Sequence, residues 1–173
     1  MIARRLFLGG ALALPAAALA GCGGWEPLYA DPSTGPASAD LRAIKVAPIP
    51  ERIGQRLEMA LRNSLNPGNE ATVPRFLLRV SLGTSIADLG IQSQGLGTRG
   101  EVSVTASYRL TDMSNGNELQ SASMHVTDSF DIQANGYSTV VAQDDAYRRA
   151  VEELRREIVV RLTLFMQNRG AAA

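Results

Sequence analysis

Hydrophobic residues alternate with polar ones along three stretches in the middle of the chain, which is the period of a β-strand with one buried face. The apolar positions are Phe76, Leu78, Val80 and Leu82, then Val102, Val104, Ala106, Tyr108 and Leu110, then Ala122, Met124 and Val126. Because Leu119 is out of phase with the third set, we expect a β-bulge near Ser121. The Asn115-Gly116 pair before that set predicts a tight hairpin turn.

Two other segments carry apolar residues at steps of three and four, which predict amphipathic helices. The first runs from Glu51 to Leu65 and is stopped by Asn66-Pro67-Gly68, and the second runs from Ser138 to Arg169. A short apolar run, 44–49, is closed by prolines and predicts a first strand near a sheet edge. The sequence therefore predicts an α+β fold of order β-α-β-β-β-α, a two-layer sandwich with two helices on one face of a four-stranded, mostly antiparallel sheet.

The other face of this sheet is predicted to be polar. Its side chains are Arg79, Ser81, Ser103, Thr105, Ser107 and Arg109. Such a face either meets water or docks on something polar.

The segment 83–100, between the first two long strands, is rich in both glycine and large apolar residues. Two interpretations stay open: a long functional loop, or strands that extend further, with the glycines marking their turn. In both cases apolar side chains such as Ile91 and Leu96 reach the hairpin tip, and exposed apolar surface indicates a contact site.

The first 21 residues have the layout of a secretory signal peptide. Arg4 and Arg5 precede an apolar run, 6–19, that is shorter than the roughly 20 residues of a membrane-spanning helix. The tetrapeptide Leu19-Ala20-Gly21-Cys22 fits a lipobox, so we expect cleavage between Gly21 and Cys22 and lipid attachment to this lone thiol. The paired arginines leave the Sec and twin-arginine export routes open.

The rest of the chain is predicted to form a lipidated N-terminus and tether over residues 22–40, one folded domain over 41–169 and a disordered tail over 170–173. The stretch 31–40 has few apolar residues and two prolines, which predicts an extended conformation. Without the two arginines of the signal, 15 basic residues face 17 acidic ones, a net charge of −2. We therefore expect no nucleic-acid partner.

Three candidate chemical motifs favour structural interpretations. Residues Gly95–Gly100 match the dinucleotide-binding pattern G-x-G-x-x-G, but a strand follows them where phosphate binding needs a helix, so a hairpin loop is favoured. His125 and Asp128 are three apart on a strand and should face opposite sides, which argues against a metal pair. Asp144 and Asp145 fit helix caps. We expect no enzyme, no metal and no cofactor.

Three segments carry a family resemblance: Gly21–Tyr29 (GCGGWEPLY), Arg52–Leu57 (RIGQRL) and Asp144–Leu162, which begins DDAYRRA. Together they resemble the alphaproteobacterial form of the LptE family of lipopolysaccharide-assembly lipoproteins, although Trp25 stands where Phe is more usual. The resemblance implies an α/β sandwich of two helices on four strands, in agreement with the order above.

The resemblance also implies a function. LptE-like proteins plug the LptD β-barrel, help it assemble and bind lipopolysaccharide, so the implied location is the periplasmic side of the outer membrane, with a lipid anchor. Because a barrel lumen is polar, the candidate contacts with barrel or lipopolysaccharide are Arg79, Arg99 and Arg109, with Ile91 and Leu96 at the hairpin. The alternatives are an auxiliary lipoprotein of a lipid ABC transporter, a periplasmic hydrolase and a purely structural envelope lipoprotein.

Overall fold

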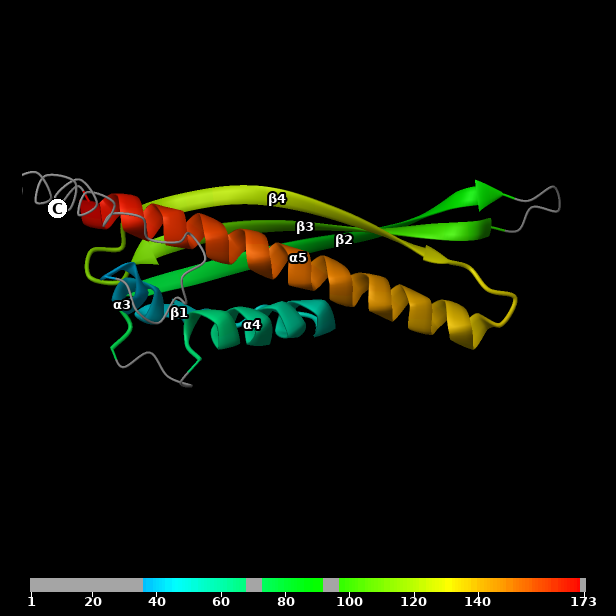
Figure 1. Ribbon diagram of the computed structural model, residues 1–173, viewed down its shortest axis with the longest axis horizontal. Coiled ribbons are helices and arrows are strands. Elements are labelled where there is room, and N and C mark those ends of the chain that lie inside the picture. Colours follow the sequence, from blue (N-terminus) through cyan, green and yellow to red (C-terminus); the bar gives the residue numbers. More distant parts are fainter. Residues whose placement is uncertain (1–35, 68–72, 92–96, 172–173) are drawn as a thin grey trace, which may run out of the picture. The chain divides into compact units, whose positions relative to one another are not determined.

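The computed structural model of the protein describes residues 36–67, 73–91 and 97–171. Its elements, in chain order, are α3 (Pro36–Arg42), β1 (Ile44–Val46), α4 (Arg52–Leu65), β2 (Phe76–Ile91), β3 (Gly97–Asp112), β4 (Glu118–Asp131) and α5 (Gly136–Ala171). The predicted α+β fold is confirmed, with helices packed on one face of a four-stranded sheet (Figure 1). The predicted signal peptide and lipobox, including Gly21 and Cys22, lie outside the described residues.

The sheet has the order β1-β2-β3-β4, with β1 parallel to β2 and the other neighbours antiparallel. β1 has only three residues and lies at an edge, as its flanking prolines predicted. β2 and β3 stay paired from Phe76 opposite Asp112 to Ile91 opposite Gly97, with irregular pairing only near the end of β2. Of the two interpretations of 83–100, the extended strands are therefore correct, and residues 92–96 lie outside the description.

The turn between β3 and β4 follows from its local sequence. Gly116 has a φ of 74°, in the left-handed region that glycine occupies without strain. Asp112 Oδ1 accepts hydrogen bonds from the N–H of Ser114 at 2.9 Å and from its hydroxyl at 2.7 Å. These local contacts confirm the tight turn predicted from the Asn-Gly pair.

A β-bulge follows this turn. The pairing of β4 with β3 skips Leu119, which is the extra residue between Glu118 and Gln120. The predicted irregularity is thus present, two residues before Ser121. Because of it, both Leu119 and the later residue Ala122 pack against the core although they differ in phase.

The core lies between one face of the sheet and the helices α4 and α5. Its strand residues include Phe76, Leu78, Val80, Val102, Val104, Ala106, Tyr108, Leu110, Met124 and Phe130, and its helix residues include Leu57, Leu61, Leu65, Ala146, Ala150, Leu154, Ile158, Leu162 and Met166. α5 packs on β3 and β4, and α4 packs beside α5 (Figure 1). Because burying one large apolar side chain contributes about 1.5–3 kcal/mol, the alternating pattern decides which face the helices cover.

The helix α3 corrects the expectation of an extended tether up to residue 40. Pro36 is its first residue, where a fixed φ suits a helix start and the missing N–H is not needed. Leu41 is only 3% exposed, and α3 packs on α5. One buried leucine in a polar stretch is too short a pattern to predict this helix from sequence.

The helix α5 is longer at both ends than the predicted Ser138–Arg169. Asn135 Oδ1 accepts the N–H of Tyr137 at 3.0 Å, and this contact places the helix start earlier than expected. Residues 170 and 171 are helical, which corrects that part of the predicted tail, because helix ends shift by one or two residues without a strong stop signal. No helix of the described residues has both the length and the apolar character needed to cross a membrane.

Candidate functional site

The sheet face opposite the helices, which we call the outer face, is polar. Its side chains are Arg79, Ser81 and Ser85 on β2, Ser103, Thr105, Ser107 and Arg109 on β3, and Ser121, Ser123, His125 and Thr127 on β4. All except the half-buried Ser103 are exposed, so no described element covers this face. The predicted polar face is confirmed.

Hydrogen bonds between side chains connect the strands of the outer face. The Ser107 hydroxyl donates to the Ser123 hydroxyl at 3.1 Å. The two ring nitrogens of His125 lie 3.0 Å from the hydroxyls of Thr105 and Thr127. The middle of the face therefore presents short hydroxyl side chains, which lose little conformational entropy when a polar partner docks on them.

Three cations gather at one end of the outer face. Arg79 and Arg109 lie directly opposite each other on β2 and β3, an arrangement in which like charges repel. Lys45, the exposed residue of β1, lies opposite Leu77, one row away. Glu118 Oε2 is 2.6 Å from Arg109 Nε and is the only described carboxylate paired with any of the three. We call Lys45, Arg79 and Arg109 the basic corner.

A hollow lies over the basic corner and can receive a ligand. Its lining includes both arginines, the rim residue Pro48 and the serines Ser107, Ser121 and Ser123. The Arg79 side chain has no hydrogen bond or ion pair with another described residue. Guanidinium groups bind phosphate and carboxylate oxygens in pairs, so this hollow is chemically suited to an anionic group.

The other predicted contact residues do not join this cluster. Arg99 is ten residues from Arg109 on β3, about 33 Å along the strand, and it donates to the Ser129 hydroxyl at 2.8 Å. Ile91 ends β2, but its side chain lies outside the description, as does the whole of Leu96. The three predicted arginines therefore form one pair and one separate position.

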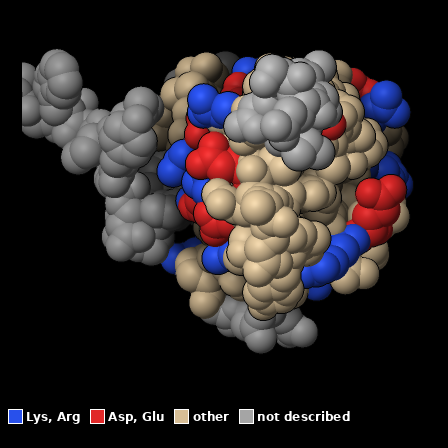
Figure 2. All heavy atoms as spheres, turned by 90° about the vertical axis from the view of Figure 1, so that its right-hand side faces the viewer, with Lys and Arg blue, Asp and Glu red and all other residues tan. Residues whose placement is uncertain are grey.

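Apolar side chains are exposed where the β2–β3 hairpin and the start of α5 lie. They are Ile86, Leu89, Tyr137, Val140 and Val141, with exposed fractions between 47% and 77%. In the end-on view of Figure 2, charged side chains gather at the sides and the centre is uncharged. The expectation of apolar side chains on the hairpin is confirmed for Ile86 and Leu89.

The glycine motif and the histidine have structural surroundings. Residues 97–100 begin a strand, and a side chain at Gly100 would collide with the ring of Phe130 on β4. Gly100 is thus explained by close packing within the sheet. His125 bonds to threonines on the outer face, whereas Asp128 binds Arg149 of α5, so the predicted opposite orientation is confirmed.

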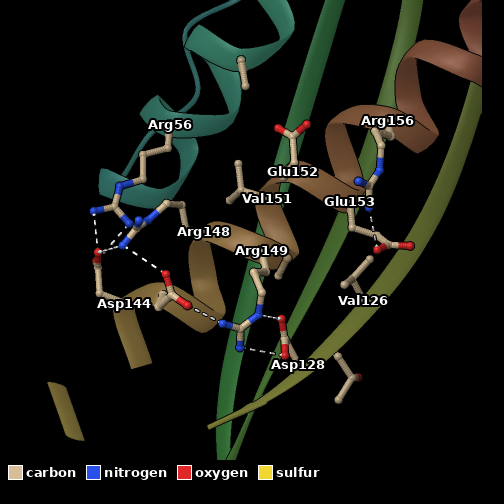
Figure 3. A pocket seen from close by; sticks show the side chains of 14 residues that line it. Arg56, Val126, Asp128, Asp144, Arg148, Arg149, Val151, Glu152, Glu153 and Arg156 are labelled. Atoms are coloured by element: carbon tan, nitrogen blue, oxygen red, sulfur yellow. Dashed lines mark hydrogen bonds and ion pairs between the residues drawn. The ribbon is translucent and has the colours of Figure 1, made fainter. Parts of the chain in front are cut away.

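The interpretation of Asp144 as a helix cap is wrong. This residue lies two turns inside α5, where its carboxylate meets Arg56 of α4 at 2.9 Å (Figure 3). It also meets Arg52 of α4 at 3.3 Å. The hydrogen bond from Arg56 holds the pKa of Asp144 below its usual value, assisted by the charges of Arg56, Arg52 and Arg148. The ion pairs therefore join the two helices.

The interpretation of Asp145 as a helix cap is also wrong. Its carboxylate binds Arg149, which also reaches Asp128 of β4 at 2.7 Å (Figure 3). The hydrogen bonds that Arg149 donates to the Asp128 carboxylate raise the pKa of Arg149 above its ordinary value. This group of charges connects α5 to the edge of the sheet and has a structural role, because each carboxylate already has a cationic partner.

Two residues of the site were missed from sequence. Lys45 lies between two buried residues of β1, so the alternation of Ile44, Lys45 and Val46 was the signal that places it on the outer face. Glu118 follows the predicted turn directly, but the bulge at Leu119 hides which side chain of β3 it meets.

Comparison with known proteins identifies the family. A family model described as LptE, lipopolysaccharide-assembly, matches residues 41–162. No curated protein matches the chain.

Several solved structures share the fold. One, described as a lipoprotein of Caulobacter crescentus, has a TM-score of 0.61 and 22% identity over 76% of this chain and 96% of that one. A minor lipoprotein of Acinetobacter baumannii has a TM-score of 0.56 and 17% identity, covering 73% of this chain and 91% of its own. Lipoprotein B of Nitrosomonas europaea has a TM-score of 0.54 and 14% identity, covering 72% and 83%. The family match spans most of the folded domain, and the chain therefore belongs to the LptE family of lipopolysaccharide-assembly proteins.

Proposed function

We propose that this protein is an outer-membrane lipoprotein that plugs the LptD β-barrel, aids its assembly and binds lipopolysaccharide on its way to the outer leaflet. In this proposal, acyl chains on Cys22 hold the domain at the periplasmic side of the membrane. The role is one of binding, without an enzymatic step. The observation that carries the proposal is an exposed polar sheet face with a basic corner, in a chain of the LptE family.

The outer face suits a barrel lumen for a physical reason. A lumen is lined by polar side chains, and the hydroxyls of the outer face both donate and accept hydrogen bonds. Burying hydroxyls is favourable only when they find partners, which a polar wall supplies and hydrocarbon does not. The hydroxyl-rich middle of the face is therefore the proposed contact with the barrel.

The basic corner suits lipopolysaccharide. Lipid A phosphates carry negative charge and several acceptor oxygens, and charge-assisted hydrogen bonds to guanidinium groups are the strong ones. Arg79 offers its donors without a described competitor, and Arg109 lies directly opposite. The exposed apolar group around Ile86 and Tyr137 is a second candidate contact with the barrel or the lipid.

The test is co-purification of the full-length chain from membranes in detergent. We expect an outer-membrane barrel of the LptD type to co-purify, and depletion of the chain to impair assembly of that barrel. Recovery of inner-membrane permease subunits alone would favour an auxiliary lipoprotein of an ABC transporter and contradict the proposal. A Cys22→Ala variant should lose fatty-acid labelling, and labelling equal to the wild type would refute the lipid attachment.

A further inference from the structure

We propose that Glu118 is an internal counter-ion that a phosphate group of lipopolysaccharide displaces from Arg109, and that it thereby weakens the binding of anions to the basic corner. This inference rests on the proposed function and adds a role for Glu118, which the proposed function does not use. It predicts that removing the carboxylate strengthens binding, which is the opposite of what loss of a ligand contact would do.

The geometry allows this displacement. Glu118 Oε2 contacts the Nε of Arg109 at 2.6 Å, and no other described residue forms an ion pair with that guanidinium. The side chains are 42% and 64% exposed, respectively. Exposed ion pairs are weak because water solvates the separated charges well, so the pair can open when a better anion arrives.

The electrostatics explain why a carboxylate lies there. Arg79 and Arg109 repel each other across the strands, and Lys45 adds a third positive charge nearby. Without a ligand, Glu118 relieves part of this repulsion. The carboxylate is covalently part of the same sheet, so its effective concentration at Arg109 is high, and a weakly charged group in solution does not compete well with it.

A phosphomonoester can compete. It carries a charge of about −1.5 to −2 at neutral pH and has three acceptor oxygens. It can therefore bind Arg79 and Arg109 together, whereas the Glu118 carboxylate binds Arg109 alone. We infer that the basic corner selects phosphomonoester groups over single carboxylates.

The ion pairs of α5 show what a non-exchangeable counter-ion looks like. Asp144 contacts Arg56 and Arg52, from a different element, and its removal would break the ion pairs between two helices. Glu118 instead joins neighbouring strands that stay paired from Arg99 opposite Asp131 to Thr111 opposite Glu118, with one bulge at Leu119. Replacing Glu118 should therefore change binding without unfolding the domain.

The test measures the dissociation constant of lipopolysaccharide at about 0.1 M salt for the wild type and for Glu118→Gln. We expect the variant to bind about two- to fivefold more tightly, because Arg109 no longer has to leave an exposed ion pair. The matched control is Glu101→Gln, which makes the same charge change on β3. Glu101 is about 26 Å along the strand from Arg109, beyond the roughly 10 Å screening length at 0.1 M salt, and should leave binding unchanged.

Two further measurements test whether Glu118 acts through Arg109 and through the phosphates of the ligand. In an Arg109→Gln background, Glu118→Gln should have no effect, and a persistent gain there would contradict displacement from Arg109. With lipopolysaccharide stripped of its phosphates, Glu118→Gln should tighten binding by a smaller factor than with the intact molecule, because the group that displaces Glu118 is missing. An equal or larger factor would contradict displacement of Glu118 by the phosphates.

The outcomes also distinguish this inference from the proposed function. If the wild type binds lipopolysaccharide and the arginine variants bind less, but Glu118→Gln binds like the wild type, the counter-ion role fails alone. If Glu118→Gln and Glu101→Gln tighten binding equally, the effect comes from net charge and the role also fails. If the wild type does not bind lipopolysaccharide at all, both proposals fail.

Discussion

The two faces of the same three strands differ in almost every physical property. Leu110 is fully buried against the helices, and its neighbour Arg109 is exposed on the outer face. The inner face is apolar and covered, and the outer face is polar and open. Because the strand period is two, one sequence encodes both surfaces at once, and stability and binding can be assigned to alternate residues.

The largest effect is expected on the inner face. Leu110→Ala removes a fully buried side chain and should lower the free energy of unfolding by about 2–5 kcal/mol, through lost burial and the cavity left behind. On the outer face, Ser107→Ala should stay within about 0.5 kcal/mol of the wild type. Urea unfolding of both variants measures the difference, and equal losses would break the distinction between the faces.

The next largest effect is expected on β4, where some backbone N–H groups bond to β3 and others point to the free edge of the sheet. Arg149 reaches the carbonyl oxygen of Ser129 from outside the sheet, so the backbone groups of Ser129 point to the free edge of β4. Successive residues of a strand point to opposite neighbours. The N–H of Ser123 therefore points to the free edge, and the N–H of Ala122 points to β3. Ala122→Pro should therefore leave a carbonyl of β3 unpaired, at a cost of about 1–3 kcal/mol. Ser123→Pro should cost less, since an edge strand tolerates proline there. The reverse order in thermal unfolding would show that the assigned edge is wrong.

A smaller effect is expected between the helices. The pKa of Asp144 is lowered in the folded protein, so its ion pairs contribute stability above the usual pKa of an aspartate, and this is lost as pH falls through the lowered value. Asp144→Asn should cost less than about 1 kcal/mol at pH 7, because the pairs are partly exposed, and a smaller amount at about pH 2. Asp131→Asn, at an exposed strand end, is the control. A loss that is the same at both pH values would contradict the electrostatic explanation.

The fold could be predicted from sequence wherever a period extends over several residues. The alternation along β2, β3 and β4 and the spacing in α4 and α5 gave the layers, the covered face and the bulge beside Leu119. The seven-residue α3 was missed, because a helix this short is fixed by tertiary packing of residues such as Leu41 and shows almost no period of its own.

The site could be predicted only in part, because contacts between distant segments leave no local pattern. The sequence places Arg79 and Arg109 on one face, but only the strand register brings them opposite each other and puts Arg99 at the far end. In the same way, the partner of Asp144 is an arginine 88 residues earlier. The local sequence favoured a capping role for Asp144, but its actual partner lies on another helix, which the local sequence does not indicate.

The most direct test of the central claim combines binding and stability in one variant, Arg79→Gln with Arg109→Gln. If the outer face binds lipopolysaccharide, affinity should fall at least about tenfold, since two charge-assisted contacts are lost. The melting temperature should change by less than about 4 °C, because both side chains are exposed and their mutual repulsion is relieved. Unchanged affinity, or a fall in affinity explained by unfolding, would contradict the assignment of binding to this face.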